Sequence, residues 1–401
     1  MQQREYDIII WGATGFTGKL VAQYMLENYS AGNLTWAIGG RNLSKLDALN
    51  LGPGVEVLVA DAMDPEALTQ LVKRTRVILT TVGPYARYGS EMVAACAAAG
   101  THYCDLTGEV HWMRDMIDNY QHTAVSSGAR IVHTCGFDSI PSDIGVYFMQ
   151  KAMMEQHGVP ASAIKYRTRA FKGGFSGGTI DSMMAMMEQA QTNPKIMDIV
   201  ADPYALNSTY RGLDGLDRKD QFYDEDFKAW VAPFVMAAIN TRVVRRSNEL
   251  LGLTYGEDFR YDEGSITGQG TGGALSAAAM ALGTSTMNGL ASITPARKLL
   301  QKVLPKPGEG PSPETIETGY FDIDLLAKHP TDPSLNLLGK VHGDRDPGYG
   351  STAKMLAECA VSLAQDELPV EGGFWTPASA MGDALLERLP NHAGVSFKLS
   401  D

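Results

Sequence analysis

Three glycines near the N-terminus follow a spacing that suits phosphate binding. The loop Gly12-Ala13-Thr14-Gly15-Phe16-Thr17-Gly18 follows an apolar run, Tyr6 to Trp11, and precedes a segment with helical spacing. In such a loop Gly12 allows the tight turn, Gly15 lets the backbone approach a pyrophosphate, and Gly18 lets the helix pack close to the strand. Free N–H groups at the start of the helix then meet the negative charge. The pattern predicts a dinucleotide site.

The end of the second predicted strand indicates which dinucleotide binds. An NAD site usually places Asp or Glu there, ~20 residues beyond the loop, to hold the ribose hydroxyls. This chain has Gly39-Gly40-Arg41-Asn42 instead. Because a guanidinium can donate two N–H bonds to a 2′-phosphate, Arg41 favours NADP. The Gly-x-x-Gly-x-x-Gly spacing of the loop points the same way. A solvated arginine at a strand end is the alternative.

The next two strand ends supply further candidates for cofactor contacts. Asp61 follows the third predicted strand and would either accept a bond from the adenine amino group or cap the next helix. Val82, Gly83 and Pro84 follow the fourth, at the sheet edge where open α/β folds bind ligands. Their small bulk suits a position beside the nicotinamide ribose, and we expect Tyr85 to point toward the cleft. A plain turn is the alternative.

Candidate catalytic groups follow the last two strands of the same region. Asp138 or Ser142 could orient a substrate or relay a proton, although such residues beside a helix start often act as N-caps. Tyr103, Asp105 and Glu109 offer a second set of possible proton donors. We name Tyr85, Asp138 and Ser142 as the catalytic candidates.

The first third of the chain alternates between strands and helices, which predicts an α/β fold: a Rossmann-type, doubly wound parallel sheet. We expect Asp64 to cap the helix that starts at Pro65. Predicted strands span 6–11, 34–39, 55–60, 76–81, 102–105 and 130–133, and predicted helices span 18–28, 43–49, 65–73, 90–99 and 110–126.

The pattern changes after about Pro141. Short strands, among them 164–171, 241–246 and 319–325, and glycine turns predict a second, α+β domain with a mixed or antiparallel sheet. Residues 351–365 and 378–388 are again helical. The predicted organisation is an NADP-binding domain over 1–140, completed by helices within 350–401, and a substrate domain over 141–349. The small-residue stretch 272–282 predicts a buried helix, with membrane contact as the alternative.

Composition excludes several functions. The 401 residues carry a formal net charge of −12, which argues against nucleic acid as the partner. Four cysteines without CxxC spacing predict neither a metal site nor a redox pair, and they fit a reducing compartment. We find no signal peptide and no strongly apolar run of ~20 residues. The expectation is a cytoplasmic protein, with peripheral membrane contact left open.

Taken together, several motifs resemble the saccharopine dehydrogenase-like oxidoreductases, and within them the trans-acting enoyl reductases. These motifs are the glycine loop, Gly40-Arg41, Val82-Gly83-Pro84-Tyr85, Tyr103 to Glu109, Cys135 to Asp143, Ser176 to Thr179, Pro307 to Ser312 and Gly348 to Met355.

The resemblance implies an NADP-dependent reductase that acts on an acyl or polyketide-type lipid, with a synthase as partner and a homodimer as one assembly. Amino-acid metabolism is not implied, because no set of arginines suited to two charged amino-acid parts can be traced. Two alternatives stay open: reduction of a C=N bond, and a non-catalytic protein that binds NADP and associates with lipid.

Overall fold

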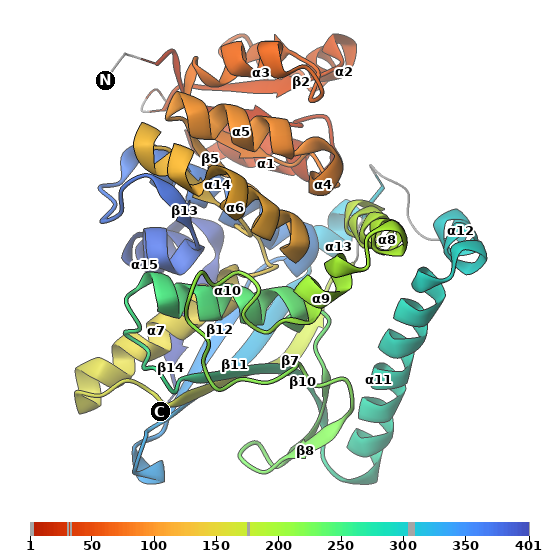
Figure 1. Ribbon diagram of the computed structural model, residues 1–401, viewed down its shortest axis with the longest axis vertical. Helices are drawn as coiled ribbons and strands as arrows, with labels where there is room; N and C mark the ends of the chain where they lie inside the picture. The colour runs from red at the N-terminus through yellow and green to blue at the C-terminus, as the bar shows by residue number, and fades with distance from the viewer. Residues whose placement is uncertain (1–3, 30–31, 33, 175–176, 304–308, 401) are drawn as a thin grey trace.

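The computed structural model describes residues 4–29, 32, 34–174, 177–303 and 309–400. Ser176 and Pro307-Gly308, named above within motifs, lie outside these residues. The described chain builds two seven-stranded sheets, A and B, with helices packed around and between them (Figure 1). The predicted fold class, a parallel Rossmann-type sheet with a second α+β part, is confirmed.

Sheet A is entirely parallel, in the order β13-β6-β5-β4-β1-β2-β3. Ile8, Ile9 and Ile10 of the inner strand β1 are fully buried, as a continuous apolar run predicts. The strand order reverses between β1 and β4, which is where such sheets bind ligands. The strands are β1 (Tyr6–Trp11), β2 (Trp36–Gly40), β3 (Glu56–Val59), β4 (Thr75–Thr80), β5 (His102–Cys104), β6 (Arg130–Val132) and β13 (Gly373–Trp375).

The helices between these strands lie close to their predicted bounds. They are α1 (Phe16–Tyr29), α2 (Leu43–Asp47), α3 (Pro65–Val72), α5 (Ser90–Ala99) and α6 (Val110–Ser127). The short helix α4 (Tyr85–Tyr88) was not predicted. Asp64 caps α3 by accepting from the N–H groups of Glu66 and Ala67, as predicted. Local rules therefore account for this half of the fold.

Residues after 350 contribute to both sheets. Helix α14 (Thr352–Gln365) contacts α1 and β4, and β13 pairs with β6 of sheet A. Helix α15 (Pro377–Arg388) contacts α7 (Ile140–His157), and β14 (Val395–Leu399) pairs with β12 of sheet B. The division into 1–140 with 350–401 and 141–349 stays a prediction.

Sheet B is mixed, in the order β14-β12-β11-β7-β10-β9-β8, and only its β7–β10 pair is parallel. Helix α7 contacts β11 and β12, and it packs so closely that a Cβ on Gly145 would lie 2.8 Å from Leu325 Cδ1. The remaining strands are β7 (Ala163–Lys172), β8 (Phe222–Asp224), β9 (Ala229–Pro233), β10 (Arg260–Gly268), β11 (Tyr320–Lys328) and β12 (Leu337–Gly343).

The strand expected over 241–246 is wrong, because these residues lie in helix α10 (Ala237–Leu250). Arg242, Arg245 and Arg246 repeat at helical spacing and are all buried. Arg242 and Arg245 pair with Asp217 and Asp214, and Arg246 donates to backbone carbonyls. These partners come from distant segments, so the local pattern could not reveal them.

Helix α11 (Gly270–Ser292) contradicts the expectation of a buried helix. It runs along one side of the molecule (Figure 1), and it contacts β9 and β10. Gly273, Ala277 and Ala281 face inward, whereas Leu275 and Leu282 are 73% and 69% exposed. Helix α11 also contacts α8 (Gly177–Thr192) and α12 (Thr294–Val303), and the remaining helices of this part are α9 (Lys195–Ala201) and α13 (Pro313–Glu317). Among the described residues, no helix is long and apolar enough to cross a membrane.

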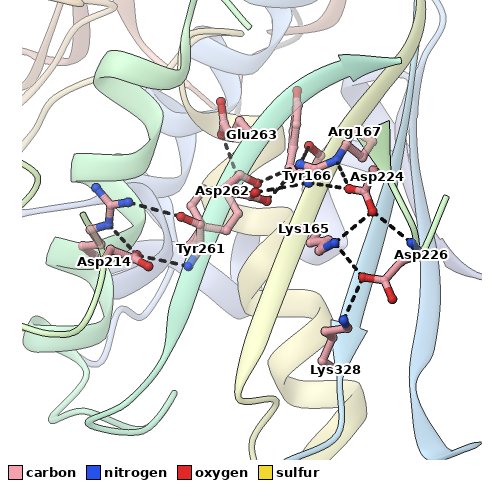
Figure 2. Close-up of polar contacts among 11 residues, drawn as sticks. Lys165, Tyr166, Arg167, Asp214, Asp224, Asp226, Tyr261, Asp262, Glu263 and Lys328 are labelled. Carbon is pink, nitrogen blue, oxygen red and sulfur yellow. Dashed lines mark hydrogen bonds and ion pairs between the residues drawn. The ribbon is translucent and has the colours of Figure 1, made fainter. Parts of the chain in front are cut away.

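An ion-pair network with a buried centre, Arg167 and Asp224, joins four strands of sheet B (Figure 2). The Arg167 side chain is fully buried and pairs with Asp224 at 2.7 Å and Asp262 at 2.9 Å. Lys165 bridges Asp224 and Asp226, and Lys328 also pairs with Asp226. Burial disfavours the charge on Asp224, but Lys165 and Arg167 outweigh it and hold the pKa of this carboxyl below its ordinary value.

Candidate active site

The glycine loop has a geometry that side chains cannot share. Gly12 has a φ of +91°, and a Cβ there would lie 2.6 Å from Val82 Cγ2. A Cβ on Gly18 would lie 2.2 Å from the Gly12 carbonyl oxygen. Thr14, Phe16 and Thr17 complete the turn into α1, whose first N–H groups lack helical partners. This bare backbone beside a helix start fits a pyrophosphate.

Arg41 lies at the same edge of the sheet as the glycine loop. It directly follows β2, whose Gly39 pairs with Trp11 immediately before the loop. Its side chain is exposed, and no ion pair holds it within the described part of the chain. The neighbouring Asn42 caps α2 by accepting from Lys45 N at 3.0 Å. Arg41 is therefore available to a phosphate, as its predicted role requires.

Asp61 stabilises the turn after β3. Its carboxylate accepts from the N–H of Met63 at 2.9 Å, two residues on, while Asp64 supplies the helix cap. The Asp61 side chain is exposed. A bond to adenine stays a prediction.

A buried carboxylate holds the segment after β4 in place. Glu109 accepts from the backbone N–H groups of Tyr85 and Ala86 at 2.8 and 2.9 Å. Val82 contacts the glycine loop, Gly83 is exposed and Pro84 is buried. These positions leave an open backbone edge beside the loop, and their contact with the cofactor stays a prediction.

We expected Tyr85 to point toward the cleft, but its side chain is buried in the protein instead. The side chain is 4% exposed, its ring packs on Trp112 with centroids 5.4 Å apart, and its hydroxyl donates to the Thr80 carbonyl. A catalytic role for Tyr85 stays a prediction that this geometry does not favour.

Asp105 is the centre of a buried hydrogen-bond network. Its carboxylate accepts from the Tyr103 hydroxyl at 2.9 Å, the His133 imidazole at 2.7 Å and the backbone N–H groups of Thr107 and Thr134. These bonds tie the ends of β5 and β6 together. Tyr103, Asp105 and Glu109 thus make hydrogen bonds inside the protein. These bonds do not favour the three residues as proton donors to a substrate.

A cavity of about 90 Å³, partly open to solvent, lies between the sheets at the carboxyl ends of the sheet A strands. Its lining is largely apolar, and among the described lining residues Asp138 carries the carboxyl group. The lining residues are Thr17, Leu106, Phe137, Asp138, Phe171, Gly173, Gly174, Phe234, Val235, Met236, Pro347, Gly348, Tyr349 and Thr352.

Asp138 is suited to proton transfer. Burial raises the pKa of its carboxyl to about 7, and the nearby Asp105 charge adds to the shift. The backbone around it is held by bonds from Phe137 N to Thr352 Oγ1 and from Ile140 N to the Gly136 carbonyl. A carboxyl group with this pKa is partly protonated at neutral pH, so it can act as an acid or a base.

Ser142 is fully buried and does not line the cavity. It lies one helical turn beyond Asp138, near the Glu263 carboxyl, whose pKa burial raises to about 7. The N-cap position of α7 is Ser139, which makes no side-chain capping bond. The geometry thus brings Asp138, but not Ser142, to the cavity.

Sequence reasoning missed the role of Tyr349. Its ring packs edge-on against Phe16 of the glycine loop, with centroids 4.7 Å apart, so it places the C-terminal segment beside the cofactor site. The only sequence signal was its motif, Gly348 to Met355, which carried a resemblance but no role.

Comparison with known proteins agrees with this geometry. The saccharopine dehydrogenase NADP binding domain matches residues 8–132. Saccharopine dehydrogenase (L-Glu forming) from Saccharomyces cerevisiae shares the fold, with a TM-score of 0.52 over 99% of this chain and 100% of that chain at 10% identity. Fold and glycine loop thus define an NADP-dependent oxidoreductase of the saccharopine dehydrogenase type.

Closer relatives narrow this class. A Mycobacterium tuberculosis protein, named provisionally as a trans-acting enoyl reductase, is 43% identical over 98% of this chain and 97% of its own length. A trans-acting enoyl reductase of Mycobacterium bovis is 38% identical over 98% of this chain and 97% of its own length. The chain belongs to the trans-acting enoyl reductase family.

Proposed function

We propose that this enzyme reduces the C=C bond of an enoyl thioester on an acyl or polyketide-type lipid, in the cavity beside Asp138. The observation that carries the proposal is an apolar cavity, next to the glycine loop, that contains a carboxyl group with a pKa near 7. Bound NADPH supplies the hydride, and the protein supplies position and electrostatics. The glycine loop and Arg41 hold the cofactor phosphates.

The cavity residues divide the remaining work. Phe137, Phe171 and Phe234 offer apolar surface to the acyl chain and exclude water from it. Asp138, when protonated, donates its proton to the α-carbon of the substrate. Asp138 is assigned as the proton donor because its carboxyl group belongs to the lining of the cavity.

Reduction of a C=N bond is the weaker candidate. Substrates of the saccharopine type carry carboxylates, and such groups are usually held by Arg or Lys. Among the residues that the structure describes, the cavity lining contains neither Arg nor Lys. An uncharged acyl chain fits these walls better.

Stopped-flow NADPH oxidation tests the proposal. We expect turnover with enoyl thioesters, faster when the acyl group is bound to a carrier of the synthase partner that the relatives' name suggests, and none with imines. Tight NADPH binding without oxidation of either substrate would instead favour a non-catalytic protein.

Arg41→Ala should weaken NADPH binding and leave NADH binding nearly unchanged. Losing one or two charge-assisted bonds of about 1.5–3 kcal/mol each predicts a loss of affinity of at least about 10-fold. Fluorescence titration with both cofactors measures it. Arg76→Ala is the matched control and should change neither affinity. Arg76 lies near the N-terminal end of β4, at the edge of sheet A opposite to Arg41. Equal losses for NADPH and NADH would refute the assignment.

We also propose that α11 and α12 contact a lipid surface. The 23 residues of α11 contain no charged side chain, yet much of the helix is exposed. In α12, Leu299 is exposed beside the exposed Lys298 and Lys302. Exposed leucines with neighbouring lysines suit the interface of an anionic bilayer. A lipid surface is also a source of acyl chains.

Liposome flotation tests this surface. The protein should float with vesicles that contain phosphatidylglycerol, and Leu275→Glu/Leu282→Glu should abolish flotation, because charge on this face opposes burial in lipid. Val125→Glu, exposed on α6, is the control and should still float. If the wild-type protein does not float, and light scattering instead shows a dimer that the double variant dissociates, the surface pairs two copies of the chain.

A further inference from the structure

The Tyr349 hydroxyl is a buried polar group without a partner. The side chain is 2% exposed, and its oxygen makes no hydrogen bond to any described residue. Leaving such a group unpaired costs about 1–3 kcal/mol. Tyr349 is one of the residues that line the cavity, so a ligand bound there lies next to this side chain.

The backbone around Tyr349 is firmly anchored. The Asp346 carboxylate accepts from the N–H of Tyr349 at 2.7 Å and from the N–H of Gly174 at 3.0 Å. A Cβ on Gly348 would lie 2.7 Å from the Gly174 carbonyl oxygen, so this segment lies directly against the end of β7. The ring contact with Phe16 fixes the other side. The hydroxyl is therefore pre-positioned.

Its surroundings keep the phenol protonated. Burial raises the pKa of Tyr349 well above its ordinary value, and the nearby charges of Asp346 and Asp138 act in the same direction. A neutral phenol can donate one hydrogen bond, and it does so best to an oxygen that gains negative charge.

We infer that Tyr349 donates a hydrogen bond to the carbonyl oxygen of the enoyl thioester and stabilises the enolate. The inference rests on the proposed function. When hydride reaches the β-carbon, the C=C electron pair shifts toward the carbonyl and places negative charge on its oxygen. The Tyr349 O–H holds that charge. The proton of Asp138 then goes to the α-carbon, the C=O bond re-forms, and the saturated thioester and NADP⁺ leave.

Tyr349→Phe tests the inference because it removes one oxygen and keeps the ring. We expect kcat for enoyl reduction to fall by about 100-fold, as for the loss of one oxyanion donor. The NADPH affinity and KM should change little, and the melting temperature should not fall because the variant removes an unpaired buried hydroxyl. A merely structural role would not produce this split. Tyr255→Phe is the matched control: Tyr255 is also buried with an unpartnered hydroxyl, but it does not line the cavity, and its loss should leave kcat unchanged.

The outcomes separate this inference from the proposed function. If wild-type enzyme reduces enoyl thioesters and Tyr349→Phe retains kcat within about threefold, well short of the loss of an oxyanion donor, only the role of Tyr349 is wrong. If wild-type enzyme reduces imines alone, or oxidises NADPH with neither substrate, the proposed function is wrong and the carbonyl acceptor named here falls with it.

Discussion

Asp138→Asn should lower kcat for enoyl reduction by about 10²–10⁴-fold, the usual contribution of a positioned general acid. The amide keeps the size of the carboxyl group but cannot give up a proton at neutral pH. NADPH binding should stay intact, because Asp138 lies after β6, whereas the loop that we propose for the cofactor phosphates follows β1. Steady-state kinetics with an enoyl thioester measure the effect. Glu155→Gln, exposed on α7, the helix that follows Asp138, should behave as wild type.

The pH profile gives the same prediction an independent check. Burial raises the pKa of Asp138 to about 7, so its acid form is lost as the pH rises through that value. The kcat of wild-type enzyme should therefore fall above about pH 7, and the residual rate of Asp138→Asn should lack this decline. A profile of the variant with an unchanged alkaline limb would assign the titrating group elsewhere.

Stability separates loss of chemistry from loss of structure. A carboxyl group with a raised folded pKa favours folding below its ordinary range, and that contribution disappears as the pH rises through the folded pKa. At pH 8 the wild-type protein bears the cost of the charge on Asp138, which the amide variant avoids. Thermal melting at that pH should find Asp138→Asn at least as stable as wild type.

The sequence predicted six of the seven strands of sheet A, all but the edge strand β13, because local signals determine them. A run of buried isoleucines, a glycine loop and a capping Asp64 each carry their meaning within a few residues. Arg41 could be chosen for the same reason, since its place after β2 follows from the strand itself. The candidate cofactor residues could therefore be chosen from the sequence alone.

The residues of the candidate substrate cavity could not be chosen from the sequence, because the fold assembles them from distant segments. The cavity takes Asp138 from the loop before α7, Phe234 from the end of β9 and Tyr349 from the segment before α14. Asp138 and Ser142 were equal candidates by sequence. One helical turn separates them, and only the packing of α7 shows that Ser142 is buried away from the cavity.

Helices α10 and α11 show the same limit in opposite directions. The arginines of α10 look exposed in sequence but are buried, because loop carboxylates and carbonyls reach them. The leucines of α11 look like core residues but are exposed, because only its Gly and Ala stripe meets sheet B. In both helices tertiary partners outweigh composition.

Arg167→Met should destabilise the protein by about 3–5 kcal/mol, because it leaves the buried Asp224 charge without its closest partner. The expected result is a lower free energy of unfolding in urea at neutral pH. Arg76→Met breaks an exposed pair with Asp7 and should cost no more than about 1 kcal/mol. A similarly small loss for Arg167→Met would show that Lys165 alone compensates Asp224.

A second variant distinguishes loss of the ion pair from loss of packing. Arg167→Met/Asp224→Leu removes both charges, and it should recover much of the stability because well-packed apolar side chains can replace a buried pair. Acid should have a parallel effect. The Asp224 pKa is lowered in the folded state, so the pair stabilises the protein above the ordinary Asp range and loses this effect as the pH falls through the folded pKa. The deficit of Arg167→Met should therefore shrink in acid, because protonation neutralises the carboxylate that the variant leaves short of its partner.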